Sequence, residues 1–462
     1  MRVLLVCYDN ESFIQWFPQG MAYIAATLLK YGHDVEIYEQ DIHHYPMEHL
    51  TKKLDNEYYD AVGLSFIGGY FEYKQAVRIS QAVNNSKQRP FYMLGGFGPS
   101  PEPDYFLKKM NADVIIHGEG ENTVIDLLTH LEEKKDLNSV FGISYRKANK
   151  TITNPSRPLI EDVDSIPMPA YHLFDIQHYR KMRLPGCTKL DFLMPVLSGR
   201  GCTFTCNFCY RMDKGFRGRS NESIIEEIRY LQKNHRITFI SFSDELLMSS
   251  ISRTISLCQA IINAKLNIKW ECNGRLNYAK PKVLKLMKES GCVYVNYGIE
   301  AFDNQILKNM NKVLTTKQIE EGIQATKAVG IMPGYNIIFG NIGESRETLM
   351  KGVDFLVKYD TEEEMRTIRP VTPYPGSPLY YHAIEKGLLD GVEDFYENKH
   401  TNSDLLTCNF TDMTDKDFYQ AMFDANERLL NNFQDRIKVQ NKETLTRLYK
   451  QHDATFRGFR HT

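Results

Sequence analysis

The chain has 462 residues, of which 42% are hydrophobic and 25% are charged, and its formal net charge is −2. This composition indicates a folded globular protein of about three domains, and the near-zero charge gives no overall attraction to nucleic acid or to anionic membranes. The longest apolar runs, such as residues 21–29, are too short to span a bilayer, and the first ten residues do not resemble a signal peptide. We therefore expect a cytoplasmic protein without nucleic-acid or membrane partners.

The first part of the chain alternates short apolar runs with amphipathic stretches, which predicts strands and helices in turn. The expected strands cover residues 2–7, 34–38, 61–66, 91–94 and 114–116. A helix is expected over residues 21–31, with Gly32 as its stop. This order predicts a doubly wound, Rossmann-like parallel sheet over residues 1–145, and such sheets bind ligands at the carboxyl ends of their strands.

Residues 146–190 show little hydrophobic periodicity and contain Pro155, Pro158, Pro167 and Pro169, so we expect a linker there. A second alternating series then begins. Its expected strands cover residues 192–197, 238–242, 268–271, 294–297, 335–339 and 367–371.

Six strand–helix units predict a full or partial parallel TIM-like barrel over residues 191–380. Two polar, amphipathic segments at 415–432 and 443–453 predict a small helical region over 381–462.

Three of the nine cysteines, Cys202, Cys206 and Cys209, lie within eight residues, directly after the first strand of the second series. A barrel places its chemistry there, at the carboxyl ends of its strands. Three thiolates can bind an iron–sulfur cube, and one iron then keeps an open position for a small molecule. A structural zinc is the alternative, but it needs a fourth ligand, and residues 211–230 contain no Cys or His.

The spacing Cys202-x-x-x-Cys206-x-x-Cys209, with the aromatic Phe208 before its last cysteine, resembles the radical S-adenosylmethionine (SAM) enzymes. The resemblance implies a [4Fe–4S] cluster whose fourth iron binds the amino and carboxylate groups of SAM, with Phe208 near the adenine. Further matches follow in order over about residues 190–380. The residues that they imply for cosubstrate binding are Asn273, Arg275, Gly298, Glu300 and Gly340.

Within these matches, Arg275 suits the SAM carboxylate because a guanidinium forms forked hydrogen bonds with it. Alternate residues of a strand face the same side, so Asn296, Gly298 and Glu300 should share one face. Residues 271, 273 and 275 should do likewise if the third strand persists that far. In the turn 340–344, Asn-Ile stands where the family commonly has Leu-Pro.

The first sheet lacks the Gly-x-Gly-x-x-Gly fingerprint of dinucleotide-binding folds. Its loop at residues 8–20 resembles instead the cobalamin-binding domain that is fused to some radical SAM enzymes, and this likeness extends to about residue 175. It implies cobalamin at glycine-rich strand ends, where the backbone can approach a corrinoid. The residues expected there are Gly20, Tyr70, Gly95, Gly96, Gly118 and Glu119. A domain that keeps the fold without binding cobalamin is the alternative.

The two resemblances together imply an enzyme whose cofactors carry the difficult chemistry. A 5′-deoxyadenosyl radical would take hydrogen from an unactivated carbon, and methylcobalamin would then donate a methyl group. We therefore expect a C-methyltransferase for a small metabolite or peptide, reduced by a flavodoxin- or ferredoxin-type electron donor. Two alternatives stay open: a radical SAM enzyme that cyclises or rearranges its substrate, and a non-catalytic corrinoid and iron–sulfur carrier.

Two smaller features have alternative interpretations. The basic residues Lys214, Arg217 and Arg219 indicate a solvated face or a contact to the cosubstrate, rather than an RNA site. Cys187 and Cys272 are interpreted as buried thiols, with hydrogen donation to a radical as the alternative.

Overall fold

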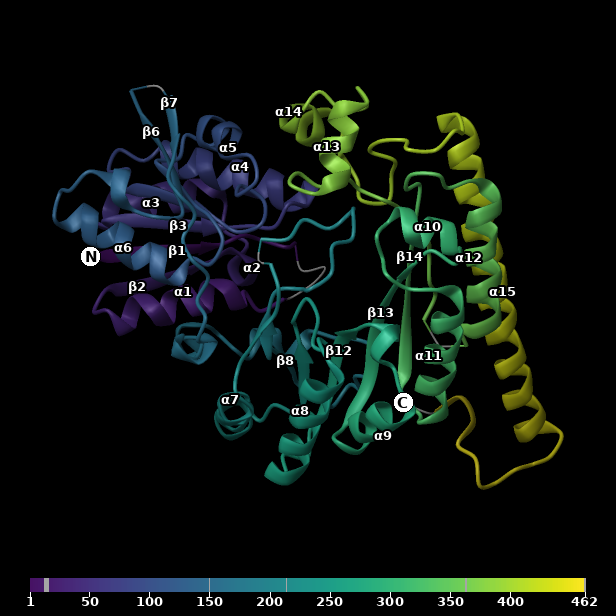
Figure 1. Cartoon of the computed structure of the whole chain (residues 1–462). Coiled ribbons are helices and arrows are strands. Elements are labelled where there is room, and N and C mark those ends of the chain that lie inside the picture. The colour runs from purple at the N-terminus through teal and green to yellow at the C-terminus, as the bar shows by residue number, and fades with distance from the viewer. Residues whose placement is uncertain (12–15, 149, 213, 362–363, 461–462) are drawn as a thin grey trace.

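The structure is a computed structural model that describes residues 1–11, 16–148, 150–212, 214–361 and 364–460. Two sheets lie side by side, and a long carboxyl-terminal helix runs along the far edge of the second (Figure 1). Residues 12–15 of the expected cobalamin-binding loop lie outside the described residues.

The first sheet has seven strands in the order β2-β1-β3-β4-β5-β6-β7. Strands β1 to β5 are parallel, and their order is that of flavodoxin-like doubly wound sheets. Their bounds are β1 (Arg2–Cys7), β2 (Asp34–Glu39), β3 (Ala61–Ser65), β4 (Phe91–Gly95) and β5 (Val114–Ile116). All five strand predictions are confirmed to within one residue at each end.

An antiparallel hairpin of β6 (Ile143–Lys147) and β7 (Lys150–Thr153) extends this sheet. The predicted domain end at residue 145 is therefore wrong, because it falls inside β6. The sequence signal is weak because only Ile143 and Tyr145 of the hairpin bury large apolar side chains, while the edge strand β7 is mostly polar and has no buried residue.

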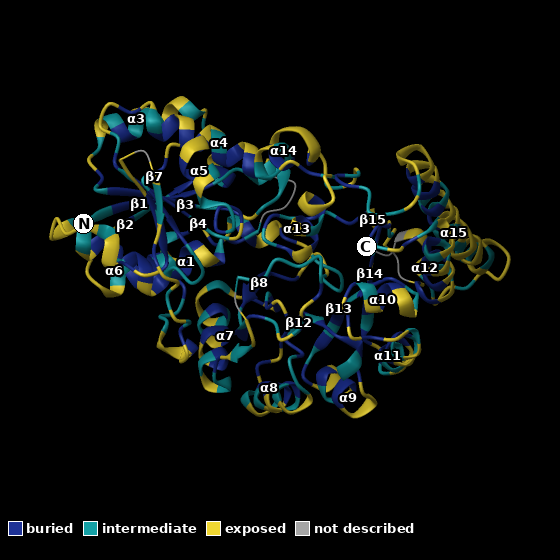
Figure 2. Ribbon diagram, turned by 45° about the horizontal axis from the view of Figure 1, so that its top comes forward, coloured by how far each residue is buried: buried dark blue, intermediate teal, exposed yellow. Residues whose placement is uncertain are grey.

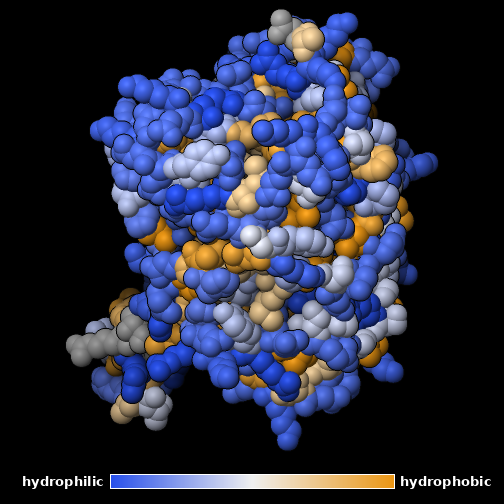
Figure 3. Space-filling model, turned by 90° about the vertical axis from the view of Figure 1, so that its left-hand side faces the viewer, coloured by the Kyte–Doolittle hydropathy of each residue, from blue (hydrophilic) through white to orange (hydrophobic). Residues whose placement is uncertain are grey.

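Helices cover both faces of the first sheet. On one face, alternate residues of β1 pack with α1 and α6, and on the other face they pack with α3, α4 and α5. The helix bounds are α1 (Gln19–Lys30), α2 (Gln40–His43), α3 (Met47–Asn56), α4 (Tyr70–Asn84), α5 (Pro103–Lys109) and α6 (Glu121–Glu132). From the side of this domain the surface is mostly hydrophilic, with apolar side chains in small groups (Figure 3).

The second sheet has six parallel strands in the order β15-β14-β13-β12-β11-β8. Because β8 and β15 lie at opposite ends of this order, the strands form a partial barrel. The bounds are β8 (Leu193–Val196), β11 (Phe239–Phe242), β12 (Lys269–Gly274), β13 (Cys292–Glu300), β14 (Met332–Phe339) and β15 (Arg369–Pro370). Each predicted strand overlaps one of them.

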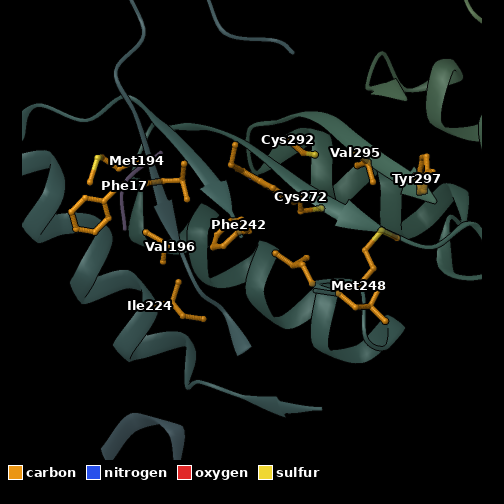
Figure 4. Close-up of a cluster of buried hydrophobic side chains, with 14 of the residues drawn as sticks. Phe17, Met194, Val196, Ile224, Phe242, Met248, Cys272, Cys292, Val295 and Tyr297 are labelled. Atoms are coloured by element: carbon orange, nitrogen blue, oxygen red, sulfur yellow. The ribbon is translucent and has the colours of Figure 1, made fainter. Parts of the chain in front are cut away.

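Helices cover the outer, convex face of the second sheet (Figure 1). They are α7 (Asn221–His235), α8 (Ile251–Ala264), α9 (Pro281–Glu289), α10 (Asn304–Asn309), α11 (Thr316–Ala328) and α12 (Arg346–Tyr359). The hydrophobic core is continuous between the two sheets, since Phe17 of the first domain lies beside Met194 and Val196 of β8 (Figure 4).

After β15 the chain returns to the first domain. Helices α13 (Pro378–Glu385) and α14 (Val392–Asp394) and a π-helical turn, η6 (Phe395–Lys399), join the core beneath α4 and α5. Tyr396, for example, stacks on Tyr73 of α4 with ring centroids 4.5 Å apart.

The chain ends in one helix, α15 (Asp415–Tyr449), which packs on α12. The prediction of two separate helices is wrong, because residues 433–442 contain no Gly or Pro to end the helix. Much of the distal part of α15 is exposed (Figure 2). Within the described ranges, no helix has the length and apolar character needed to cross a membrane.

The docking of α15 gives a prediction. Phe418 is fully buried and stacks on Phe339 with ring centroids 5.0 Å apart. Phe418→Ala should therefore lower the free energy of unfolding by ~3–5 kcal/mol. The control Phe423→Ala, on the same helix where the side chain is 60% exposed, should change it by less than ~0.5 kcal/mol. Guanidinium unfolding measures both, and equal losses would contradict the docking.

Candidate active site

The three cysteines lie in a loop that follows β8, at the carboxyl end of the strand as predicted. Its neck is a short antiparallel pair, β9 (Gly199–Arg200) and β10 (Arg217–Gly218), and we call residues 199–218 the cysteine hairpin. An isolated parallel bridge joins Cys202 to Lys214 beyond this antiparallel pair. Gly201 turns the chain out of β9 with a φ of 81°, a conformation that favours glycine.

The three thiols lie within electrostatic range of one another. Burial is the main cause that raises the pKa of Cys209 to about 12, and the charges of Cys206, Glu300 and Cys202 add to it. Among the described residues, no group of Cys, His, Asp or Glu side chains converges on a single metal ion. A four-iron cube needs no such convergence, because each thiolate binds its own iron. The hairpin therefore fits a cluster held by three cysteines.

Asn207 fastens the cysteine hairpin to the rest of the barrel. Its N–H donates to the Met310 carbonyl at 2.9 Å, and its carbonyl accepts from the Leu379 N–H at 2.8 Å. Its amide exchanges two hydrogen bonds of 3.0 Å with the amide of Asn341. In the turn 340–344 this chain has Asn-Ile where the family commonly has Leu-Pro. The hydrogen-bonded pair accounts for this difference, since neither Leu nor Pro carries a side-chain amide.

Glu300 ends β13 beside the cysteines. It has a φ of 69° and follows a register shift after Gly298. Its Oε1 accepts a 2.7 Å hydrogen bond from Nζ of Lys312, and both side chains are nearly buried. A Cβ at position 298 would collide with this carboxylate, so Gly298 and Glu300 share a face as predicted. Lys312 also lies 5.8 Å from the ring centroid of Phe208.

Arg275 contacts the cysteine hairpin from the end of the third barrel strand. Strand β12 ends at Gly274, one residue before it. Its guanidinium lies 3.4 Å from the ring centroid of Phe204 in the cysteine hairpin, and it donates to the Lys312 carbonyl. Within the described chain, its buried Nε has no hydrogen-bond partner. An unpaired guanidinium N–H beside the cysteines fits the carboxylate of SAM.

A row of amides crosses the concave side of the barrel. Asn336 donates to Asn296 at 2.9 Å, Asn296 donates to Asn273 at 3.0 Å, and Asn273 donates to the Asp244 carbonyl at 3.0 Å. Their strand neighbours belong to the core under the outer helices, as Figure 4 shows for Cys272, Val295 and Tyr297. The predicted shared faces of β12 and β13 are thus confirmed.

Glu271 lies two residues along β12 from Asn273 and is 7% exposed. Its Oε1 accepts a hydrogen bond from the Ser241 hydroxyl. Burial raises the pKa of this carboxyl to about 7, and the Ser241 hydroxyl opposes the shift. The interior of the barrel therefore contains a carboxyl group that titrates near neutral pH.

The strand ends of the first sheet leave room for a large ligand. Among the described residues, no heavy atom lies within 4 Å of a Cβ built at Gly20 or Gly118, and at Gly95 the nearest is 3.8 Å away. Gly96, with a φ of 94°, packs instead against the backbone of Phe66. Gly20, Gly95 and Gly118, but not Gly96, fit the cradle that a corrinoid would fill.

Two other residues expected at cobalamin have contacts elsewhere. The ring of Tyr70 meets His400 of the carboxyl-terminal region edge-on, with centroids 5.8 Å apart. The Glu119 carboxylate forms ion pairs with Arg200 and Arg217 of the cysteine hairpin. The Glu119 carboxylate is thus occupied across the domain interface, and a contact of this residue with cobalamin stays a prediction.

Gly340, expected near SAM, is a turn residue with a φ of 97°. Its N–H donates to Glu344 at 2.7 Å, and a Cβ would lie 2.8 Å from the ring of Phe418 in α15. The side of Gly340 on which a side chain would project is thus covered by the carboxyl-terminal helix.

Of the smaller features, the interpretation of the basic residues changes, and that of the two cysteines as buried thiols is retained. Arg217 and Arg219 are buried or nearly so in ion pairs and do not form a solvated patch. Cys272 is fully buried in the outer core, away from the concave side. Cys187 packs in a small apolar cluster with Met182 and Leu193, and burial raises its pKa to about 11.

The cysteine hairpin touches the first domain at its tip. The ring of Tyr210 meets that of Phe97, which follows β4, with centroids 5.9 Å apart. Gly376, in the segment after β15, packs against Tyr210 and against Pro101 of the first domain. The carboxyl ends of both sheets therefore face each other across the hairpin.

Comparison with known proteins agrees with this geometry. Residues 196–356 match the Radical SAM superfamily, and residues 8–128 match the B12 binding domain. An uncharacterized methyltransferase of Pyrococcus horikoshii is 31% identical over 402 residues, covering 84% of each chain. An anaerobic magnesium-protoporphyrin IX monomethyl ester cyclase of Rubrivivax gelatinosus is 27% identical and covers 80% of this chain and 67% of its own.

Among solved structures, the radical SAM methyltransferase TsrM of Kitasatospora setae, with cobalamin and a [4Fe–4S] cluster bound, has the same fold. The TM-score is 0.73 at 18% identity, over 92% of this chain and 90% of that chain. A cobalamin-domain sheet facing a cysteine-bearing partial barrel defines a class of radical enzymes. The chain belongs to the cobalamin-binding radical SAM enzymes, whose cofactors are a [4Fe–4S] cluster, SAM and cobalamin.

The cysteine assignment predicts iron content. After anaerobic reconstitution, the wild type should hold about four irons per chain, as a single cube requires. Cys202→Ala, Cys206→Ala and Cys209→Ala should each retain less than about one, because two thiolates do not hold a cube. Cys258→Ala, which removes a buried thiol of α8, is the control and should keep the wild-type content. Equal iron in Cys206→Ala and Cys258→Ala would contradict the assignment.

The raised pKa of Glu271 predicts a pH dependence of stability. Between about pH 4.3 and pH 7 the folded state holds a proton that the unfolded state releases, so rising pH lowers the free energy of unfolding. Glu271→Gln removes this loss. The stability of the variant relative to wild type should therefore rise over this range by up to about 3 kcal/mol. Denaturant unfolding at several pH values measures it.

The control for this series is Glu289→Gln, which makes the same substitution where the wild-type side chain is 51% exposed. A constant difference between Glu271→Gln and wild type would contradict the assigned pKa.

Proposed function

We propose that this protein is a cobalamin-dependent C-methyltransferase that acts on an unactivated carbon of a small metabolite or peptide. The relative that carries the proposal is the Pyrococcus horikoshii protein, which is named a methyltransferase and is 31% identical over 84% of the chain. TsrM, also named a methyltransferase, has the same arrangement of domains at a TM-score of 0.73.

The residues of the site support this chemistry. When bound, the cluster and SAM supply a 5′-deoxyadenosyl radical, and methylcobalamin supplies the methyl group. Arg275 offers its unpaired Nε to the SAM carboxylate, and Glu300 offers a carboxylate to the amino group. Lys312, which pairs with Glu300, adds a second cation at the same place.

The substrate is proposed to lie between the mouth of the barrel and the strand ends of the first sheet. The segment 372–379 borders this region, since Gly376 contacts both the cysteine hairpin and Pro101 of the first domain. Such a cover excludes water from reactive species. The amide row and Glu271 give the interior polar groups, which favours a substrate with hydrogen-bonding groups.

A second candidate function is cyclisation or rearrangement without methyl transfer. The observation that favours it is the likeness to the Rubrivivax gelatinosus cyclase, at 27% identity over 80% of the chain. A non-catalytic corrinoid and iron–sulfur carrier is the third candidate. A flavodoxin- or ferredoxin-type donor is the proposed source of electrons. The cytoplasmic location and the absence of nucleic-acid and membrane partners stay predictions.

Reconstitution distinguishes the three candidates. The protein is incubated without oxygen with cobalamin, a reductant, methyl-labelled SAM and a small-molecule cell extract. A methyltransferase should form both S-adenosylhomocysteine and 5′-deoxyadenosine and place the label on a new product. Cys206→Ala, which should not hold the cluster, is the control and should form no 5′-deoxyadenosine. Deoxyadenosine without a labelled product would favour cyclisation, and intact SAM would favour the carrier.

A further inference from the structure

One carboxylate of the first domain binds both arms of the cysteine hairpin. Glu119 follows β5, and its Oε1 accepts hydrogen bonds of 2.9 Å from Nη1 of Arg200 and from Nη1 of Arg217. Its Oε2 accepts from Arg217 at 2.8 Å and from the Ile160 N–H of the linker at 2.7 Å. Three separate segments of the chain therefore meet at a single side chain.

A second carboxylate completes the group. Glu121, at the start of α6, accepts a 2.5 Å hydrogen bond from Nη2 of Arg200. The exposed fractions of the side chains are 7% for Glu119 and Glu121, 13% for Arg200 and 10% for Arg217. Two carboxylates face two guanidiniums, so the group is neutral, and its burial protects it from screening by salt. We call these four residues the hairpin clamp.

The clamp lies at the neck of the hairpin, close to the cysteines along the chain. Arg200 pairs directly with Arg217 in the β9–β10 register, and Arg200 precedes Cys202 by two residues. The tip of the hairpin meets the first domain through Tyr210 and Phe97. The core contact at Phe17 joins the two sheets, but among these contacts only the clamp holds the neck itself.

The partners of Glu119 stabilise its charged form. Burial alone would raise the pKa of the Glu119 carboxyl, but its hydrogen bonds to Arg217 and Ile160 and the charge of Arg200 outweigh burial, and the pKa is lowered. Glu119 therefore stays ionised at neutral pH, and its charge-assisted hydrogen bonds are of the strong, directional kind.

We infer that Glu119 is a positioning residue that holds the cysteine hairpin in a fixed orientation to the strand ends of the first domain. This inference rests on the proposed function, because the orientation matters when a cluster and a corrinoid act on one substrate. A methyl group reaches a carbon radical only if both reactive centres contact the same molecule, and displacements of about 1 Å are costly in such sites. The clamp sets that spacing from outside the site.

The first test follows the hairpin itself. Glu119→Gln keeps the shape of the side chain and removes its charge, so amide hydrogen exchange over residues 199–218 should become about tenfold faster. The control is Asp191→Asn, which removes another buried carboxylate, 8% exposed and paired with the half-buried Lys269 at 2.9 Å, before β8. The control should leave exchange over these residues unchanged. Unchanged exchange in Glu119→Gln would overturn the inference.

The second test reads the spacing between the cofactors. In the protein loaded with both, pulsed EPR of the reduced cluster and cob(II)alamin gives a distribution of cluster–cobalt distances. It should be narrow in wild type and in Asp191→Asn, and broader in Glu119→Gln, a change that lost stability alone would not cause.

Arg217→Lys is a second variant that tests the inference if the Glu119→Gln protein does not fold. It keeps the charge and loses the planar fork, so it should broaden the distances to a smaller extent. Wild-type distances in every folded variant of Glu119 and Arg217 would overturn the inference and leave the proposed function intact. A wild type that holds no cobalamin would overturn both, so the two failures are distinguishable.

Discussion

Three thiols must hold a cluster of four irons, and the iron left without a protein ligand must point toward the site that the first domain completes. This constraint requires that the cysteine hairpin be held in a fixed position by the rest of the chain. Asn207 ties it to the loop after β14 and to the first turn of α13, and Arg275 packs on Phe204. Glu119 holds its neck from the first domain. The hairpin is thus fixed by polar contacts from four parts of the chain, and its own two strands are only two residues each.

The two domains meet through an apolar contact and an ionic contact, and the two differ in how they contribute to stability and to orientation. The apolar contact at Phe17 and β8 joins the two cores and supplies non-directional stability. The hairpin clamp buries four charges and gains little net stability, because desolvation offsets their attraction. Its bonds are directional, however, so a wrong orientation of the hairpin leaves buried charges unpaired. Apolar burial accounts for the association of the domains, and the ionic group accounts for the orientation of the hairpin between them.

The sequence allowed the prediction of those features that depend on a local pattern of residues. The parallel strands of both sheets follow from apolar runs, and the cysteine loop follows from spacing within eight residues. The β6–β7 hairpin was missed because only alternate residues of a polar strand face the core. The roles of Glu119 and Asn341 were missed because their partners are distant: Arg200 is 81 residues from Glu119, and Asn207 is 134 residues from Asn341. No local signal indicates Lys312, whose partner Glu300 becomes its neighbour only through the bend after β13.

The central claim is that one iron of the cluster lacks a protein ligand and receives SAM. Mössbauer spectroscopy of the ⁵⁷Fe-reconstituted protein, recorded with and without SAM, tests it most directly. The account predicts four irons in a 3:1 pattern, in which the single iron changes its isomer shift when SAM is added. Four equivalent irons whose isomer shifts do not change when SAM is added, or a tetrathiolate zinc in place of the cube, would contradict it.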